Sequence, residues 1–377
     1  MKINGSRHRT ELLAQLRPGR THSRSELAAS TGLSVATVSR ITRDLVRRKV
    51  LLEVAAVSSP AALGRPTRSL ELNGDSGRVL GISLLYPVLR ALVLNLRGEV
   101  LKQTDAPVSW NKGAAGVLQP LKKTVQALAR GNPRLAAVGL ALPGQWDPAT
   151  GVSVSYPRVP DWHEVPIRKH LEEWAGVPAT LIGYAPAMAV AEQAARIKAE
   201  PRNLVTVEVA ENIAMGAIVN GDVLQGVSGN AGELGHIPVD PSGPICYCGA
   251  KGCLESRATT SALLEEMGDR RAASFEDVVK MARNGDSYCA RLLGRVARMV
   301  GVGLATALNL FNPEVLVLNG RFFNAGDLVS GPVRNAIQEH AIPSSLKRLV
   351  IEQSKLGLRA QPLGAGLVAI REAVRRL

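Results

Sequence analysis

Long hydrophobic runs are absent from this sequence of 377 residues. A helix needs roughly 20 apolar residues to cross a bilayer. The longest candidate, Met299–Phe311, is interrupted by two glycines and by Asn309. The basic start, MKINGSRHRT, has no apolar core behind it, as an export signal would have. These absences argue against an integral membrane protein, and we expect a cytoplasmic protein with no membrane partner.

Aromatic residues make up only 3% of the chain, and cysteine occurs four times. Three of the four cysteines fall within eight positions, and with one histidine they give the order H-x9-C-x-C-x4-C: His236, Cys246, Cys248 and Cys253. Zinc favours four nitrogen or sulfur ligands in a tetrahedron. A short loop rich in Gly and Pro cannot bury enough apolar surface to order itself. The pattern therefore predicts a structural Zn²⁺ site.

The alternatives for these residues are a disulfide between Cys246 and Cys253, or cysteines that are merely buried. The sequence shows no export signal, and the fourth cysteine, Cys289, lies far away in the chain. Cytosolic thiols stay reduced. Both observations favour the metal over the disulfide.

Positive charge is concentrated at the N-terminus. The net charge is +14, and residues 1–75 hold 13 Lys and Arg against 6 Asp and Glu, an excess of seven. Half of the net charge therefore lies in about a fifth of the chain. Such a concentration predicts a polyanionic partner, most often nucleic acid. The charge on the remaining residues is typical of a solvated surface.

Three short helices are predicted in the same region, at Ser6–Leu16, Arg24–Ser30 and Val35 to about Lys49. Ser23 and Ser34 are placed to cap the second and third helices, and Gly32 can supply a left-handed turn between them. Leu33, Val38 and Ile41 are expected in a shared core. This spacing is typical of a helix-turn-helix, whose second helix enters the major groove of double-stranded DNA.

The outward face of the third helix carries the candidate DNA-binding residues, Ser34, Thr37, Arg40, Arg43 and Arg47. We expect Thr37 and Arg40 to reach base edges and the other arginines to meet phosphates. The alternative is a solvated basic helix in a small bundle.

A strand is expected next at Val50–Val57, followed by a loop at 58–67 and a returning strand at Arg68–Leu72. These elements would complete a winged helix-turn-helix. Arg65 stands in this loop between a glycine and a proline. An arginine so placed can enter an A·T-rich minor groove, where the negative potential is strongest. The alternative is that it only keeps the loop soluble.

From residue 73 onward, short strands alternate with helices in two halves. The expected strands are Val79–Leu84, Ala91–Asn95, Val100–Gln103, Leu135–Leu140, Ala179–Ile182, Leu204–Val209, Gly216–Val219 and Val315–Leu318. The expected helices are Leu118–Ala129, Ile167–Trp174, Ala187–Lys198, Thr260–Glu266, Phe275–Arg283, Ser287–Leu310 and Ala365–Arg375. The pattern predicts an α/β class with domains at 1–72, 73–190 (joined by the C-terminal helix, 360–377) and 191–359.

The cysteine segment resembles the signature of the ROK family in three blocks: Gly232–His236, Cys246–Gly249 and Gly252–Glu255. The family contains sugar kinases and sugar-responsive transcriptional repressors. The resemblance covers essentially the whole chain. It implies a two-lobed, actin-like (ribonuclease H-like) ATPase-fold body that carries the zinc loop, with a cleft between the lobes. It also implies a Gly-Arg-Pro wing like the one at Arg65.

The residues that the family's kinases use for catalysis are largely missing. The Asp that would accept a proton from the sugar corresponds to Tyr184, a phenol with a pKa of about 10 and thus a poor base. The neighbouring Asn corresponds to Gly183. The first phosphate loop, residues 81–87, has no carboxylate for Mg²⁺ and no glycine pair.

The glycine-rich second phosphate loop reads Ala210-Glu211-Asn212-Ile213-Ala214-Met215-Gly216, and the adenosine-side glycine pair has become Asn319-Gly320-Arg321. Glu211 would put a negative charge beside the phosphates. We therefore expect no enzyme activity and no binding of ATP or Mg²⁺. An active ATP-dependent sugar kinase is kept as an alternative.

The residues that match the family's sugar-binding site are partly retained. Glu233, His236 and Glu255 match the family's sugar-contacting positions, and Arg158 stands where the family usually has Asn. A buried arginine there would favour an anionic ligand, such as a sugar acid or a phosphosugar. Glu233 and Glu255 could equally brace the zinc loop, and the effector could be of another kind or absent.

The best-supported hypothesis is that the protein is a transcriptional regulator, expected to be a repressor. Its body would bind a sugar or sugar-derived effector between its lobes. One winged helix covers too little DNA for useful specificity, so a homodimer or homotetramer on an inverted repeat is expected. The alternative is an effector-independent regulator whose body serves oligomerisation.

Overall fold

The computed structural model describes residues 2–55, 68–85, 88–156, 158–196, 200–268 and 272–376. The chain forms two compact units, residues 1–187 with 361–377, and residues 188–360. The divisions fall at 187/188 and 360/361, where the sequence suggested 190/191 and 359/360. In the described part of the chain, no helix combines the length and the apolar character needed to cross a membrane.

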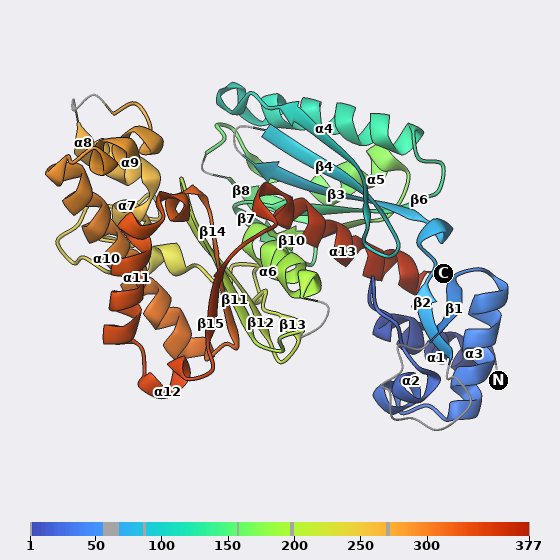
Figure 1. Ribbon diagram of the computed structural model, residues 1–377. Helices are drawn as coiled ribbons and strands as arrows, with labels where there is room; N and C mark the ends of the chain where they lie inside the picture. Colours follow the sequence, from blue (N-terminus) through green and yellow to red (C-terminus); the bar gives the residue numbers. More distant parts are fainter. Residues whose placement is uncertain are drawn as a thin grey trace. The chain divides into compact units, whose positions relative to one another are not determined.

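The N-terminal part of unit 1 holds three helices and a two-stranded antiparallel sheet (Figure 1). The elements are α1 (Lys2–Gln15), α2 (Arg24–Thr31), α3 (Val35–Arg47), β1 (Leu51–Ala55) and β2 (Arg68–Leu72). The first helix starts at Lys2, four residues earlier than expected.

The local signals in the helix-turn-helix stretch act as predicted. Ser23 forms a capping box with Glu26, and the Ser34 side chain accepts a hydrogen bond from the backbone N–H of Thr37. Gly32 has φ 68°, the left-handed conformation that ends α2. Val38 and Ile41 are buried, whereas Leu33 is only half-buried, contrary to expectation. The buried leucines of this region are Leu12, Leu13, Leu16, Leu27 and Leu45.

The main sheet of unit 1 has the order β10-β6-β3-β4-β5. Its strands are β3 (Arg78–Leu85), β4 (Val88–Asn95), β5 (Val100–Pro107), β6 (Leu135–Leu142) and β10 (Ala179–Gly183). The pairs β3–β6 and β6–β10 are parallel, and β3, β4 and β5 form an antiparallel meander. A small sheet, β7 (Gln145–Asp147), β8 (Val152–Ser155) and β9 (His163–Val165), was not predicted, because its strands are only three or four residues long.

Helices cover both faces of this sheet (Figure 1). On one face, alternate residues of β3 pack with α4 (Gly113–Arg130), and α5 (Ile167–Ala175) contacts β6 and β10. On the other face, α13 (Ala360–Arg375) lies so close that a Cβ built on Gly81 or Gly139 would come within 2.0 Å of a helix carbonyl oxygen. The last helix thus packs as part of unit 1 only because two strand residues have no side chain. Helix α6 (Tyr184–Ala195) starts in unit 1 and ends in unit 2.

The sheet of unit 2 has the order β13-β12-β11-β14-β15. Its strands are β11 (Leu204–Val209), β12 (Ile213–Val219), β13 (Asp222–Val223), β14 (Val315–Asn319) and β15 (Val350–Gln353). Strands β11, β14 and β15 are parallel, and β12 and β13 continue the sheet antiparallel. The edge strand β15 was not predicted from the sequence.

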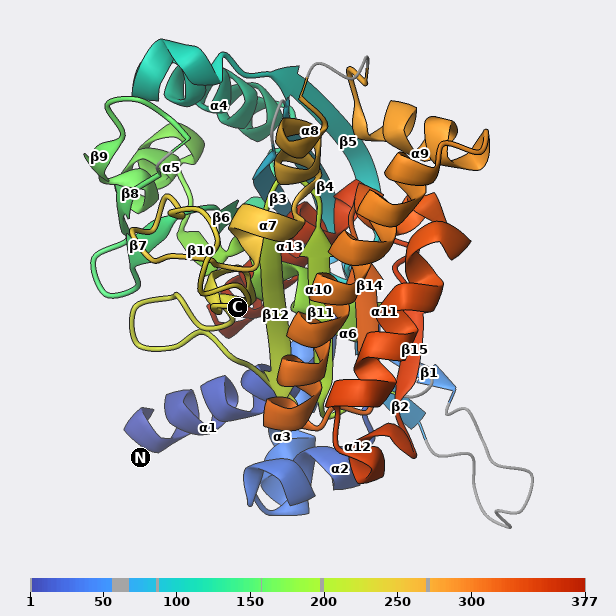
Figure 2. The ribbon, with the colours of Figure 1, turned by 90° about the vertical axis from the view of Figure 1, so that its left-hand side faces the viewer.

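One face of this sheet is covered by α10 (Ser287–Phe311) and α11 (Asp327–His340) (Figure 2). The odd-numbered residues of β11 face these helices, so Thr206 and Glu208 point to the opposite face. The shorter helices are α7 (Glu255–Ala258), α8 (Thr260–Met267), α9 (Phe275–Arg283) and α12 (Pro343–Leu346). The segment between β13 and α7 contains the histidine and the three clustered cysteines.

Candidate functional site

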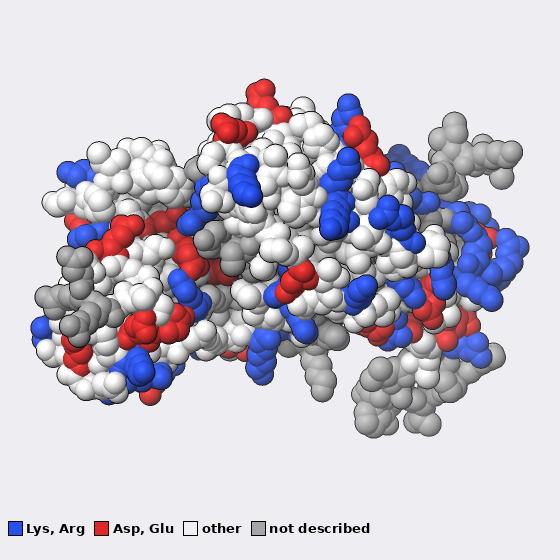
Figure 3. All heavy atoms as spheres, turned by 90° about the horizontal axis from the view of Figure 1, so that it is seen from above, with Lys and Arg blue, Asp and Glu red and all other residues white. Residues whose placement is uncertain are grey.

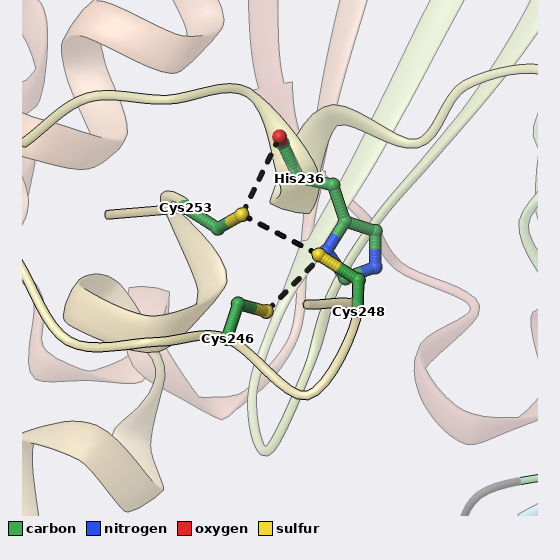
Figure 4. Close-up of side chains that lie close together, drawn as sticks. All are labelled: His236, Cys246, Cys248 and Cys253. Atoms are coloured by element: carbon green, nitrogen blue, oxygen red, sulfur yellow. Dashed lines mark hydrogen bonds between the residues drawn. The ribbon is translucent and has the colours of Figure 1, made fainter. Parts of the chain in front are cut away.

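Four side chains of unit 2 converge in the loop between β13 and α7 (Figure 4). They are His236, Cys246, Cys248 and Cys253, and their ligand atoms all lie within 4.8 Å of one another. His236 ends a short 3-10 helix, Leu234–His236, and Cys253 stands two residues before α7. The backbone of Cys253 forms an isolated β-bridge with Pro238, which brings the two ends of the loop together. The structure therefore assembles the set of four residues that the sequence predicted.

The contacts within the cluster show which ring nitrogen faces the sulfurs. His236 Nδ1 lies 3.6 Å from Cys246 Sγ, and Cys248 Sγ lies 3.7 Å from Cys253 Sγ. Cys253 Sγ is also 3.5 Å from the carbonyl oxygen of His236. All four cysteines of the chain are free, so the disulfide alternative is not the arrangement found.

The surroundings of two of the three thiols disfavour the thiolate form unless a cation is close. Burial raises the pKa of Cys246, and it raises the pKa of Cys253 to about 12. A hydrogen bond from the backbone N–H of Ala250 holds the pKa of Cys248 below its ordinary value. Thiolates are the metal-binding form of cysteine, and buried thiols ionise only when a positive charge is close. Three sulfurs and one imidazole nitrogen are a donor set that could hold a metal ion.

The other ring nitrogen of His236 is held from outside the cluster. His236 Nε2 lies 3.1 Å from the hydroxyl oxygen of Tyr247 and 3.7 Å from a carboxylate oxygen of Glu233. The rings of His236 and Tyr247 meet edge to face, with centroids 5.2 Å apart. Sequence reasoning missed Tyr247, although its position between two candidate ligands was a usable signal. Second partners of this kind orient a ligating histidine.

The residues expected to contact a sugar have different surroundings. Glu255 is buried, and its Oε2 accepts a hydrogen bond of 2.8 Å from the backbone N–H of Ile213, so one oxygen braces the start of β12. Glu233 is exposed, with a side-chain relative accessibility of 57%. Arg158 belongs to unit 1 and is exposed, which corrects the expectation of a buried arginine: it follows a strand end and lies in a surface turn. An exposed Arg158 gives no reason to expect an anionic ligand.

The candidate DNA-binding residues lie along one side of α3. Arg40, Arg43 and Arg47 are exposed, whereas Val38 and Leu45 on the opposite side are buried. In the view of Figure 3, Lys and Arg side chains gather over the N-terminal helices and strands. The helix thus presents a continuous basic face to solvent.

Three of these residues already have partners in α3 or at its cap. The Ser34 hydroxyl caps α3 and lies 2.9 Å from the Thr37 hydroxyl, and Arg47 forms an ion pair of 2.5 Å with Asp44. Among the residues that the structure describes, Arg40 and Arg43 have no side-chain hydrogen bond or ion pair. Arg65 lies outside the described residues.

Tyr184 and Glu211, which the family resemblance matched to a kinase's base and phosphate loop, both make side-chain contacts. Tyr184, at the start of α6, accepts a hydrogen bond of 2.8 Å from the side-chain amide of Gln361 at the start of α13. Gln361 is 1% exposed. In unit 2, Glu211 forms an ion pair with Arg321. Sequence reasoning gave no role to Gln361, because the contact joins residues 177 positions apart.

Comparison with known proteins identifies both transcriptional repressors and sugar kinases as relatives. A sequence model of the ROK family matches residues 81–372. The xylose repressor of Bacillus spizizenii is 24% identical over 363 residues, covering 95% of this chain and 94% of its own.

Two solved structures extend the comparison. A ROK family transcriptional regulator, described as a homolog of the E. coli MLC protein, matches with a TM-score of 0.82 and 26% identity, covering 98% of this chain and 96% of its own. The ROK hexokinase of Thermus thermophilus matches with a TM-score of 0.68 and 31% identity, covering 78% of this chain and 98% of its own.

Proposed function

This chain belongs to the ROK family, and we propose that it is a DNA-binding transcriptional regulator that acts as a repressor. One observation carries the proposal. The arrangement of α2, the left-handed Gly32 and α3 presents exposed arginines, in a chain that matches a xylose repressor over nearly its full length. The range that the family model matches starts at residue 81, so this N-terminal arrangement is additional to the kinase-like body.

The N-terminal elements α1–α3 and β1–β2 are assigned to a winged helix-turn-helix on double-stranded DNA, with α3 in the major groove. Thr37 and Arg40 face base edges, and Arg43 and Arg47 face phosphates. Ser34 serves mainly as the cap of α3, since its hydroxyl accepts the N–H of Thr37. Arg65 is assigned to an A·T-rich minor groove.

The test of DNA binding is a titration of fluorescent DNA selected by the protein from a random pool. Removing a phosphate contact with Arg43→Ala should reduce the slope of log K against log salt by about 0.9. Arg40→Ala should instead reduce discrimination between selected and scrambled DNA by about 1–3 kcal/mol. Lys123→Ala, at an exposed position of α4, is the matched control. Unchanged affinity, slope and discrimination in both arginine variants would refute the assignment of α3.

A Zn²⁺ ion is assigned to His236 Nδ1 and to the sulfurs of Cys246, Cys248 and Cys253, which would be its four ligands. The convergence of one nitrogen and three sulfurs within 4.8 Å supports this choice, because zinc prefers such donors. When bound, the ion would supply the positive charge that keeps buried thiols ionised. No step of a reaction is assigned to it.

An effector site is assigned to Glu233 and His236, with a sugar or sugar derivative as the ligand. The exposed carboxylate of Glu233 can accept hydrogen bonds from neighbouring hydroxyls, and it lies 3.7 Å from His236 Nε2. Glu255 contributes through its remaining oxygen while it braces Ile213. Arg158 belongs to unit 1 and is given no role in this site.

The test of the effector is thermal unfolding of the zinc-loaded protein with neutral sugars, aminosugars, sugar acids and phosphosugars, followed by DNA release. A ligand at a hundredfold excess over its Kd stabilises by about 2.7 kcal/mol. An effector must bind one state better than the other to change DNA binding. A protein that binds DNA but responds to no compound would replace this proposal with an effector-independent regulator.

We assign no kinase activity to the chain. The hydroxyl of Tyr184 is engaged by Gln361, and Glu211 puts a carboxylate at the loop where phosphates would approach. A coupled assay for ADP formation across hexoses and aminosugars tests this. Turnover above background that is lost in a Tyr184 variant would overturn it.

A homodimer or homotetramer is the expected form on DNA, because two half-sites supply the specificity that one winged helix lacks. Sedimentation of the protein with and without selected DNA measures the number of chains. A single chain on each DNA duplex would contradict this assignment.

A further inference from the structure

The carboxyl ends of β11 and β14 meet at one edge of the sheet in unit 2. The two strands are adjacent and parallel, with Glu208 paired to Asn319 at their last register position. Ligands of open α/β sheets bind outside the carboxyl ends of parallel strands. Two charged residues follow these strands at this edge, Glu211 two residues after β11 and Arg321 two residues after β14.

The guanidinium of Arg321 is the centre of a small charged cluster at this edge. It forms an ion pair with Glu211, and its Nη2 donates a hydrogen bond of 3.2 Å to the hydroxyl of Thr260. A carboxylate oxygen of Glu276 lies 3.8 Å from the other terminal nitrogen, Nη1, of Arg321. The Nε of Arg321 is buried and has no hydrogen-bond partner among the residues that the structure describes. The guanidinium thus has donor capacity that the carboxylates do not use.

The backbone fixes the position of this guanidinium. Gly320 has φ 95°, and a Cβ there would come within 2.3 Å of the carbonyl oxygen of Val209, so only glycine permits this approach of the two loops. The backbone N–H of Thr260 donates a hydrogen bond of 2.8 Å to the carbonyl oxygen of Ala210. Thr260 is fully buried. The site is therefore held by three segments, not by a mobile surface side chain.

We propose that Arg321 anchors a binding site for phosphate-type oxyanions and that the carboxylate of Glu211 is its built-in occupant. Arginine binds carboxylates and phosphates with the same planar fork of donors. A carboxylate tethered on the neighbouring loop acts at an effective concentration on the order of millimolar or higher. The tethered carboxylate therefore keeps Arg321 from binding free phosphates whose Kd is in the millimolar range.

This arrangement goes beyond the proposed regulation by a sugar. It makes unit 2 insensitive to free phosphate and to phosphate carried by nucleotides. Glu276 does not replace Glu211 in this role, because it is farther from Arg321 and its side chain is 63% exposed, so solvent and salt screen its charge.

The test uses the full-length protein and its melting temperature in inorganic phosphate, with chloride at equal ionic strength as the reference. In about 10 mM phosphate, Glu211→Gln should gain about 3 °C over chloride, and the wild type less than about 1 °C. Glu276→Gln is the matched control and should behave as the wild type. The double variant Glu211→Gln with Arg321→Met should lose the gain.

If the glutamine of the Glu211→Gln variant keeps the contact with Arg321, the same melting-temperature measurement is made on Glu211→Ala.

ATP without Mg²⁺ then distinguishes the two sources of phosphate. A larger shift in melting temperature with ATP than with inorganic phosphate indicates that the site binds a nucleotide, and an equal shift indicates that it binds the phosphate group alone. Either result supports the site. Folded Glu211 variants that respond to phosphate no more than to chloride would overturn the proposal, as would a gain that persists without Arg321.

Discussion

His236 turns one ring nitrogen toward Cys246 and the other toward the hydroxyl of Tyr247, at 3.6 and 3.1 Å. The same imidazole therefore belongs to the cysteine cluster and to the surface that carries Glu233. A metal ion bound at Nδ1 would fix the orientation of the ring, and with it the position of Nε2. We expect the metal to control the shape of the neighbouring effector surface without contacting the effector.

Removal of the metal should destabilise unit 2. Chelation, or Cys253→Ser, should lower the melting temperature by at least about 5 °C, on the order of 2 kcal/mol for a unit of this size. Elemental analysis should give one zinc per chain in the wild type. Cys289→Ala is the matched control, because Cys289 is buried in the core away from the cluster and should leave the zinc content unchanged. A wild-type protein that contains no metal and is indifferent to chelators would refute the site.

Tyr184→Phe should destabilise the protein although it removes a single oxygen. The side-chain amide of the buried Gln361 would lose its partner, which costs about 1–3 kcal/mol. Urea unfolding measures the difference. Tyr288→Phe is the control, since the hydrogen bond from the hydroxyl of Tyr288 to the carbonyl oxygen of Glu266 is exposed and 3.4 Å long. Equal stabilities of the two variants would show that the contact with Gln361 contributes nothing.

Gly139→Ala should weaken the packing of α13 on the sheet of unit 1. The new Cβ would meet the carbonyl oxygen of Ala365 at 2.0 Å, and neither backbone can move without disturbing the sheet. Overpacking of this kind costs about 1–3 kcal/mol. Gly131→Ala, where the nearest atom would be 3.5 Å away, should be tolerated. Thermal unfolding of both variants measures the contrast, and a well-folded Gly139 variant of full stability would be inconsistent with this packing.

Glu53 should make the N-terminal region sensitive to acid. Its hydrogen bonds with Arg24 and then Arg68 hold the pKa of the carboxyl below its ordinary value. A lowered folded-state pKa contributes stability above the ordinary pKa of about 4.3, and this contribution is lost as the pH falls through the folded-state pKa.

Glu53→Gln should therefore be less stable than the wild type at pH 7, by no more than about 1 kcal/mol because the pair is partly exposed. The two proteins should begin to converge below about pH 4.3 and become equal once the pH has fallen through the lowered folded-state pKa. Glu173→Gln is the control, since the carboxylate of Glu173 approaches its partners only to 3.9 Å. A difference between Glu53→Gln and the wild type that is constant from pH 7 to 3 would contradict the linkage.

Local signals predicted most of the elements, and they failed where an element depends on its neighbours. Ser23, Gly32 and Ser34 set the limits of α2 and α3 by contacts within a few residues, so they could be read directly. The edge strand β15 is only four residues long and is defined by its pairing with β14. No periodicity in so short a stretch separates a strand from a loop.

The sequence by itself determined the four-residue cluster and the basic residues of α3, because these depend on residue type and close spacing. Only the tertiary structure decided that Arg158 is exposed, that Gln361 binds Tyr184, and that Arg321 faces Glu211. The contacts of Gln361 and Arg321 join residues more than a hundred positions apart, and burial depends on the packing of distant segments. Their partners are set by how the strands order in the sheets, which residue type and spacing do not encode.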